Sequence, residues 1–564
     1  MAFFSKRPRY DVCIVGSGAG GGMAAYVLTR AGANVVMLEA GQNWDNTTDS
    51  AMLTWPYETH HRGAATPERN FGEFDAGLGG WSLPGEPYTK APGTDFGWFR
   101  VRMLGGRTNH WGRISLRFGP DDFHRKDLDG LGDNWPIRYD DLARYYDQVD
   151  RLIGIFGSHE NLPNEPDGVF QPAPKPRCYE LMVKDACDRL DITCIPARLS
   201  VITRPLNGRP ACHYCGQCNR GCAVNANFSS TNVLLPPARA TGKLTIITEA
   251  MVREVTVGAD GKATGVSYVN KTTGNDEHIQ ADIVVLAASA CESARILLNS
   301  KSSRYPQGLA NTGGVVGKYL TDTTGTDVAG FIPRMADGHP HNEDGVGGNH
   351  VYMPWWLDNS KLDFPRGYHI EVWGGRGVPS AGFMGGIHRY PDFGGYGQAL
   401  KQSYRKYYGT TIGFSGRGEM IPNEDSYCEI DPRTVDRWGI PVLRFHWGWT
   451  DYEYNQVKHM QETFRALIAE MGGEVFSPMP GRDRGYGIAD GGVIIHELGC
   501  VRMGNDESTS ALNRNCQAWD VSNLFVVDGG PFVSQADKNP TWTILANSWR
   551  VSDHIAERRR NGGF

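Results

Sequence analysis

The chain has 564 residues, which is long enough to bury a large core. Its formal net charge of −6 means that it carries no net positive charge to attract a polyanion. Its one short basic run is Arg558–Arg560, which argues against nucleic acid as a partner. Hydrophobic residues make up 40% of the chain without a run of 18 apolar residues, which excludes a membrane-spanning helix at the level of sequence.

The N-terminus leads into a core strand. Residues 1–10 include three basic side chains but continue directly into an apolar segment, which is typical of a buried strand rather than a cleavable export signal. The sequence therefore predicts no signal of its own and a cytoplasmic location.

A strand, a glycine turn and a helix follow one another at the start of the chain. Tyr10–Val15 is an apolar run of strand character, and Met23–Leu28 is a helical stretch. Between them, Gly16 permits a tight turn, Gly18 lets the backbone approach a pyrophosphate, and Gly21 lets the helix pack on the strand. This order predicts a dinucleotide site.

A second strand supports that prediction. Asn34–Leu38 ends in Glu39, about 20 residues after the turn, where a carboxylate can hydrogen-bond a ribose hydroxyl. The spacing does not separate FAD from NAD, and a glycine-rich loop without a ligand is the alternative.

Four of the twelve cysteines lie close together, at Cys212, Cys215, Cys218 and Cys222. Twelve are too few for a disulfide scaffold in a chain of this length, so the clustering indicates metal chemistry in a reducing compartment. The spacing matches the run that holds iron–sulfur clusters. Structural zinc usually takes two separated Cys-x-x-Cys pairs and is the first alternative, followed by thiols without metal.

Four further segments carry a family resemblance. They are Leu104–Trp111, Ile283–Ala290 continuing to Arg295, His496–Gly504, and Asn523–Gly529 with Asn539–Ile544. In this order they resemble the flavin loop, the second signature, the catalytic-histidine segment and the closing segment of the glucose–methanol–choline (GMC) oxidoreductase family. The resemblance implies that FAD is the cofactor and that the chain oxidises an alcohol.

The resemblance also implies an α/β fold with two domains. A Rossmann-type FAD-binding domain is assembled from discontinuous segments, and a substrate domain carries an antiparallel sheet. The FAD-binding domain is expected from residues 1–120, 205–330 and 490–564, and the substrate domain from residues 121–204 and 331–489. Strand-like runs at Thr326–Ile332, Gly367–Gly374 and Thr410–Phe414 agree with such a sheet.

Alcohol oxidation at a flavin requires a base for the hydroxyl proton while hydride leaves the carbon for flavin N5. The resemblance assigns His496 as this base and Asn539 as the group that hydrogen-bonds the substrate oxygen. Cys500 departs from the small hydroxyl residue common in the family. Besides Gly16, Gly18, Gly21 and Glu39, the cofactor-binding residues are expected to be Gly105, Gly106, Asn109, His110, Val252, Asp528, Gly529 and Thr541.

His110 precedes a tryptophan in the flavin loop. In some sugar-oxidising relatives a histidine in this place is covalently attached to the flavin, whereas others bind FAD without the bond. A loop histidine that packs near the ring is the alternative.

The cysteine loop resembles an insertion in the large subunits of FAD-dependent sugar dehydrogenases, including glucoside 3-dehydrogenases. These subunits pair with a small subunit and a haem or quinone acceptor. In such relatives three cysteines can suffice, corresponding to Cys212, Cys218 and Cys222, so both a [3Fe-4S] and a [4Fe-4S] cluster stay open. The resemblance also implies export to the periplasm alongside a signal-bearing small subunit.

The expected function is therefore an FAD-dependent sugar or glycoside dehydrogenase that passes electrons through an iron–sulfur cluster. One alternative is an oxidase of the same fold that uses O₂, and another is a non-catalytic flavin-scaffold subunit with structural zinc. Five tryptophans could stack on a sugar ring: Trp355, Trp356, Trp373, Trp447 and Trp449.

Overall fold

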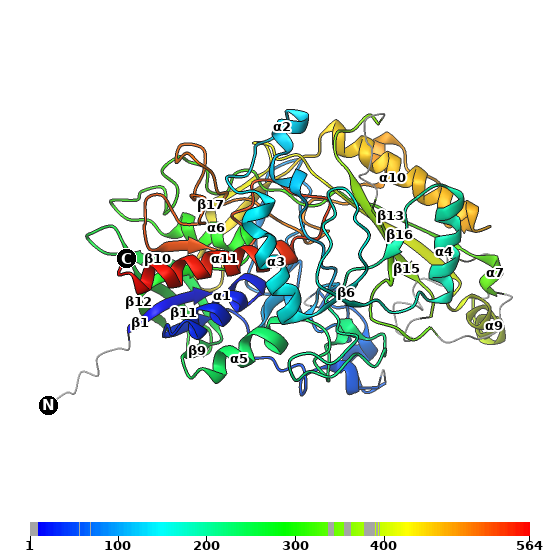
Figure 1. Cartoon of the computed structure of the whole chain (residues 1–564), viewed down its shortest axis with the longest axis horizontal. Coiled ribbons are helices and arrows are strands. Elements are labelled where there is room, and N and C mark those ends of the chain that lie inside the picture. The colour runs from blue at the N-terminus through cyan, green and yellow to red at the C-terminus, as the bar shows by residue number, and fades with distance from the viewer. Residues whose placement is uncertain are drawn as a thin grey trace.

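The computed structural model describes residues 9–55, 57–67, 69–336, 343–354, 362–376, 390, 393 and 395–564. Two sheets lie at opposite ends of an elongated molecule, each with helices packed on it (Figure 1). One sheet is mixed and the other antiparallel, so the predicted α/β fold with an antiparallel second sheet is confirmed.

The first sheet holds the glycine turn. Its parallel part has the strand order β20-β12-β1-β2-β9, and β11 and β10 extend β12 in antiparallel fashion. The bounds are β1 Arg9–Val15, β2 Val35–Leu38, β9 Leu244–Ile247, β10 Ala250–Val257, β11 Ala263–Asn270, β12 Asp276–Leu286 and β20 Leu524–Val526. The central strands are continuous apolar runs because both of their faces are buried.

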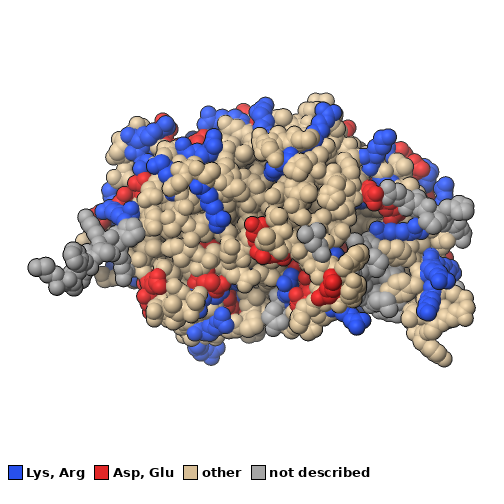
Figure 2. Space-filling view, turned by 90° about the horizontal axis from the view of Figure 1, so that it is seen from below, with Lys and Arg blue, Asp and Glu red and all other residues tan. Residues whose placement is uncertain are grey.

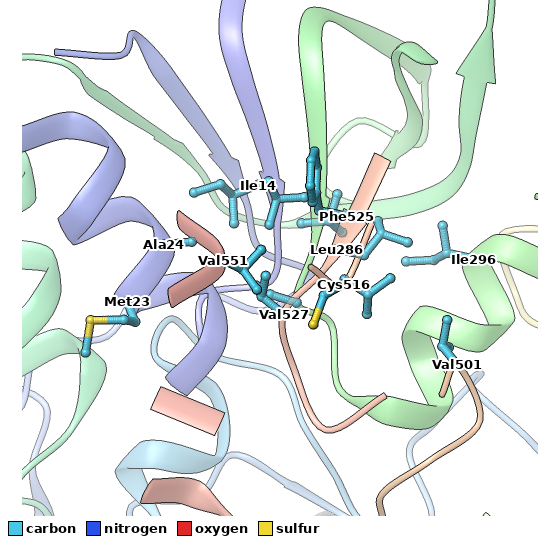
Figure 3. Packing of buried hydrophobic residues seen from close by; sticks show 14 of the residues in the cluster. Ile14, Met23, Ala24, Leu286, Ile296, Val501, Cys516, Phe525, Val527 and Val551 are labelled. Atoms are coloured by element: carbon cyan, nitrogen blue, oxygen red, sulfur yellow. The ribbon is translucent and has the colours of Figure 1, made fainter. Parts of the chain in front are cut away.

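Helices from the two ends of the chain pack on this sheet. In Figure 1, α1 (Ala19–Arg30) and α11 (Thr541–Arg560) lie side by side. Figure 3 places Met23 of α1 and Val551 of α11 in one apolar cluster with Ile14 of β1. This packing carries the segment before α11, which contains Asn539, to the end of β1 where the glycine turn begins.

The second sheet has the order β19-β13-β16-β15-β14-β8. Its strands are β8 Ile195–Pro196, β13 Asp327–Phe331, β14 Val351–Pro354, β15 Tyr368–Gly374, β16 Thr411–Gly418 and β19 Glu474–Val475. All three strand-like runs expected from the sequence are strands of this sheet. Helices α10 (Asp451–Glu470) and α4 (Cys178–Arg189) lie beside this sheet (Figure 1). Apolar residues of its strands and of both helices form one cluster.

Smaller elements complete the fold. The other α-helices in the described part of the chain are α2 Arg125–Asp129, α3 Tyr139–Ile153, α5 Leu235–Ala240, α6 Ala290–Asn299, α7 Pro333–Ala336 and α9 Gly397–Tyr407. The small sheets pair β3 Gly79–Gly80 with β5 Arg100–Val101, β6 Ile155–Gly157 with β7 Phe170–Pro172, and β18 Pro441–His446 with both β4 Thr89–Lys90 and β17 Tyr427–Val435.

The expected domain limits stay a prediction. Helix α3 lies in a range expected for the substrate domain, yet its Leu142, Tyr146 and Val149 belong to the apolar core around the first sheet. Conversely, β13 begins at Asp327, just before the expected limit at residue 330, and pairs in the second sheet.

Acidic and basic side chains are interspersed over the face seen in Figure 2. Among the described helices, none combines the length and apolar composition that crossing a bilayer requires.

Candidate active site

A cavity of about 550 Å³ is lined by residues of both sheets. Gly16 and Gly18 of the glycine turn border it, and α1 begins at Ala19 on the same border. No described side chain caps this helix, so its first N–H groups are available to a ligand in the cavity. The volume lies in the range of small-molecule and cofactor sites.

Each of the three glycines of the turn is required for a different structural reason. Gly16 has φ +97°, and a Cβ there would lie 2.3 Å from the carbonyl oxygen of Ala287. A Cβ on Gly21 would lie 2.0 Å from the carbonyl oxygen of Gly16, so this residue permits the helix to pack on the strand. Gly18 has open space where its Cβ would be, as close backbone approach to a ligand requires.

Glu39 is buried beside the turn and lines the cavity. Its Oε2 accepts a hydrogen bond of 2.5 Å from the Ser17 hydroxyl, and its Oε1 accepts one of 2.8 Å from the N–H of Gly41. Burial raises the pKa of this carboxyl, and the hydrogen bonds oppose that shift. Ser17 also accepts from the N–H of Gly105 at 2.8 Å, so the glycine turn and the loop expected along the flavin are tied together.

Most of the other expected cofactor residues border the same cavity. They are Gly106, His110, Val252, Asp528, Gly529 and Thr541. Gly21, Gly105 and Asn109 are not among the described residues that line it. Asn109 is fully buried behind the loop, where its Nδ2 donates to the carbonyl of Leu104 at 2.8 Å. The cavity thus combines uncapped helix N–H groups, a buried carboxylate and a glycine that leaves room for a ligand. This combination fits a dinucleotide cofactor.

His496 and Asn539 meet on the wall of this cavity. Nε2 of His496 lies 3.3 Å from Nδ2 of Asn539, and Nδ1 lies 2.8 Å from the hydroxyl oxygen of Thr323. Because an amide nitrogen only donates, Nε2 is the acceptor and the ring proton is on Nδ1. Gln535 donates to the same hydroxyl oxygen at 2.7 Å, which fixes Thr323 and through it the imidazole.

The environment of His496 keeps its imidazole neutral. Burial and, to a smaller extent, the positive charge of Arg417 lower its pKa, Glu371 acts in the opposite direction, and the net result is a pKa of about 3. The neutral ring can take a proton at Nε2, where a substrate hydroxyl would lie. Oδ1 of Asn539 is buried and has no described hydrogen-bond partner, so it is free for a ligand.

Three charged residues on the wall of this cavity were missed by sequence reasoning. Asp327, Glu371 and Arg417 line the same cavity from strands of the second sheet. Oε1 of Glu371 accepts from Nδ2 of Asn539 at 3.4 Å, and Arg417 lies 3.5 Å from its other oxygen. The sequence did contain a signal for Glu371, because it lies between apolar neighbours in a strand. Side chains alternate between the two faces of a strand, so this pattern places the carboxylate on the face away from the apolar core.

The tryptophans that were expected to stack on a sugar ring lie in different environments. The side chain of Trp373 is 43% exposed and donates to Ser415 at 3.1 Å. Trp447 and Trp449 pack with the apolar core of the first sheet. Trp355 and Trp356 lie outside the described residues.

Cys500 is fully buried and is not among the described residues that line the cavity. Its sulfur lies 3.8 Å from that of Cys428. At this position the cysteine therefore has a packing role.

His110 has a defined partner beside the cavity. Its Nδ1 lies 2.6 Å from Oδ1 of Asp75, and its ring packs against Phe71 with centroids 4.4 Å apart. A carboxylate fixes the proton on the nitrogen that it contacts. Nε2 is therefore the ring nitrogen left with a free lone pair.

The four clustered cysteines surround a small second cavity. Cys218 and Cys222 are buried, whereas Cys212 and Cys215 are half-buried. Backbone N–H groups of Tyr214, Ala226 and Gly347 donate to the sulfurs of Cys212, Cys222 and Cys218 at 3.3, 3.2 and 3.3 Å. No three His, Cys, Asp or Glu side chains in the described part of the chain converge as ligands of a single metal ion would.

Arg113 lies between the cysteine loop and the loop that carries His110. It is buried and donates to the carbonyls of Trp111 and Asn109 at 2.6 and 2.9 Å. Burial raises the pKa of the Cys218 thiol, and the positive charge of Arg113 opposes that shift. Arg113 forms no ion pair with a described carboxylate; burial lowers the pKa of its guanidinium, and Cys218, Cys222 and Asp75 oppose that shift.

The sequence matches known family models over most of its length. Two models described as GMC oxidoreductase match residues 133–324 and 422–548, and one described as FAD binding domain matches residues 9–54. These matches cover the glycine turn, the cysteine loop and both His496 and Asn539.

Curated relatives and solved structures are similar along the whole chain. The 2-methyl-1,2-propanediol dehydrogenase of Mycolicibacterium austroafricanum is 31% identical, over 97% of this chain and 95% of its own. The fructose dehydrogenase large subunit of Gluconobacter japonicus is 23% identical, over 98% of each chain. Pyridoxine 4-oxidase from Mesorbium loti has a similar fold, with a TM-score of 0.61 and 15% identity over 97% of this chain and 99% of its own.

Proposed function

Since the chain belongs to the GMC oxidoreductase family, whose enzymes act on hydroxyl groups with FAD, we propose that it is a dehydrogenase that oxidises a hydroxyl of a sugar or glycoside to a carbonyl. The observation that carries this proposal is the pairing of His496 and Asn539, 3.3 Å apart, on the cavity that the glycine turn also borders.

The side chains divide the work at the substrate oxygen. His496 accepts the hydroxyl proton at Nε2, while Thr323 holds the ring through Nδ1. The amide of Asn539 hydrogen-bonds the oxygen and keeps it beside the imidazole. When bound, the flavin supplies the hydride acceptor at N5. Asn539 is buried and His496 is half-buried on the cavity wall, which limits the access of water to the reacting groups.

A substrate panel tests this function. We expect anaerobic mixing of the FAD-loaded enzyme with hexoses and methyl glycosides to bleach the flavin. The names of two similar proteins, a fructose dehydrogenase subunit and a diol dehydrogenase, support polyhydroxylated substrates. If only 2-methyl-1,2-propanediol bleached the flavin, the substrate would be a small diol rather than a sugar. If none of the alcohols bleached it, the proposal would be overturned.

We further propose that Cys212, Cys215, Cys218 and Cys222 hold an iron–sulfur cluster, which when bound accepts electrons one at a time. The N–H donors to three of the sulfurs and the buried charge of Arg113 support an anionic group here. Structural zinc is the alternative, and metal analysis of the protein distinguishes the two.

A partner is part of this proposal. The similar fructose dehydrogenase chain is named as a large subunit, which supports a small partner subunit for this chain also. We expect this partner to lead to a haem or quinone acceptor. Export together with that subunit would then place the complex in the periplasm.

Two alternatives have distinct signatures. An oxidase of the same fold would consume O₂ during turnover, and the fold alone does not separate the two because pyridoxine 4-oxidase shares it. A non-catalytic scaffold would bind FAD without being reduced by any alcohol. The retained His496 and Asn539 pair argues against the scaffold.

We also propose that His110 is covalently linked to FAD, because Asp75 holds Nδ1 and leaves Nε2 with a free lone pair at the cavity. Acid precipitation of the holoenzyme is then expected to give a yellow pellet and a colourless supernatant. The variant His110→Ala is expected to release all of its flavin into the supernatant. A yellow supernatant from the unaltered chain would contradict the bond.

A further inference from the structure

A row of polar residues crosses the second sheet on the face toward the cavity. Asp327 of β13 and Glu371 of β15 both pair in register with Ser415 of β16. Arg417 follows two residues later on β16, on the same face of the sheet. The neighbouring residues Val328, Ile370 and Phe414 lie instead in the apolar cluster that contains α10.

The row leads away from the reacting pair. Glu371 contacts Asn539 at 3.4 Å and Arg417 at 3.5 Å. Asp327 stands at the exposed end of the row, and one of its carboxylate oxygens accepts a hydrogen bond from Ser415. Trp373 donates to the same Ser415 and is exposed beside it. The cavity wall thus carries charged groups besides the two side chains of the reacting pair.

These groups suit a ligand with many hydroxyls. Charges that border a binding cavity are desolvated when a ligand enters, and this costs free energy unless the ligand supplies hydrogen bonds. Within the described part of the chain Asp327 forms no ion pair, and the Glu371–Arg417 contact is long enough to admit other partners. A simple alcohol has one oxygen, already used at His496 and Asn539, and would offer no hydrogen bond to Asp327 or to the Glu371–Arg417 pair.

We propose that Asp327, Glu371 and Arg417 bind hydroxyls on substrate carbons other than the one that is oxidised, and so select polyhydroxylated substrates over simple alcohols. The inference rests on the proposed function. The carboxylates accept hydrogen bonds from ring or chain hydroxyls, and the guanidinium donates to them.

The test compares Asp327→Ala with the unaltered enzyme, because Asp327 lies two strands away from Glu371 and has no described contact with His496 or Asn539. The measured quantity is the second-order rate constant of anaerobic flavin reduction, with the best hexose or methyl hexoside and with cyclohexanol. We expect it to fall roughly 10- to 100-fold for the sugar, the scale of a lost hydrogen bond to a charged group, and to change less than about two-fold for cyclohexanol.

A series of deoxy sugars sharpens the test. The hydroxyl that Asp327 binds is the one whose removal slows the unaltered enzyme but has no additional effect on Asp327→Ala. Arg417→Lys keeps the positive charge but loses the planar fork, so it is expected to raise the sugar concentration needed for half-maximal reduction. Asp363→Ala, an exposed carboxylate near α10, is the control and should behave as the unaltered chain.

The outcomes separate the two proposals. Equal losses for sugar and cyclohexanol, or no loss for either, would overturn the polar row as a specificity site. Reduction of the unaltered enzyme by cyclohexanol but by no polyol would also overturn it, while leaving alcohol oxidation intact. Failure of every alcohol to reduce the flavin would overturn the proposed function itself. Flavin absorbance and thermal melting of each variant establish that it is folded.

Discussion

Replacing His496 by alanine is expected to slow flavin reduction by about two to four orders of magnitude, the usual contribution of a positioned acid–base group, while FAD stays bound. Nε2 of this histidine is the described acceptor beside Asn539, and alanine would leave no group there to take the hydroxyl proton. Stopped-flow mixing with an excess of the best sugar measures the rate. His446→Ala removes a partly exposed histidine bonded to Glu429 and serves as the matched control.

The pH dependence gives the same experiment a second readout. The pKa of His496 is lowered to about 3, so its base form persists as the pH falls below the ordinary histidine value of about 6.5. The rate of flavin reduction should therefore change little between about pH 8 and pH 5 and decline only at lower pH. A decline centred on the ordinary value, or near-normal reduction in His496→Ala, would assign the base to another group.

Replacing Cys218 by serine is expected to leave reduction of the flavin by substrate intact and to abolish turnover with the natural acceptor. The substrate loses its proton to His496 and its hydride to the flavin at the first cavity, whereas Cys218 lies at the second cavity. Because even outer partners of metal sites contribute about 10- to 100-fold, loss of a direct thiolate should lower acceptor-linked turnover by at least about 100-fold. Parallel assays of anaerobic bleaching and acceptor reduction separate the two steps.

Metal analysis and two further cysteine variants complete this test. Anaerobically prepared protein should contain iron and acid-labile sulfide, and Cys178→Ser, which removes an exposed cysteine on α4, should retain both. Iron that survives in Cys215→Ser would indicate that Cys212, Cys218 and Cys222 suffice. Zinc without iron, or full acceptor-linked turnover in Cys218→Ser, would contradict the relay.

The sequence by itself determined those features whose physical cause is local. The turn at Gly16 needs a residue that tolerates φ +97°, and the strand before it is a continuous apolar run, so both were visible in consecutive residues. The strand-like runs of the second sheet were predicted for the same reason, because alternation along a strand is a local pattern. The spacing of the cysteine loop was likewise legible along the chain.

Only the tertiary structure decided which distant side chains share the cavity. Asp327, Glu371 and Arg417 come from three strands, and their common direction follows from the pairing register of the sheet, which no short segment encodes. Thr323, whose contact orients His496, comes from a loop far from it in the chain. Asn109 shows the converse: its place in the loop motif suggested contact with the cofactor, but packing turned its side chain toward the protein interior, where it braces the loop.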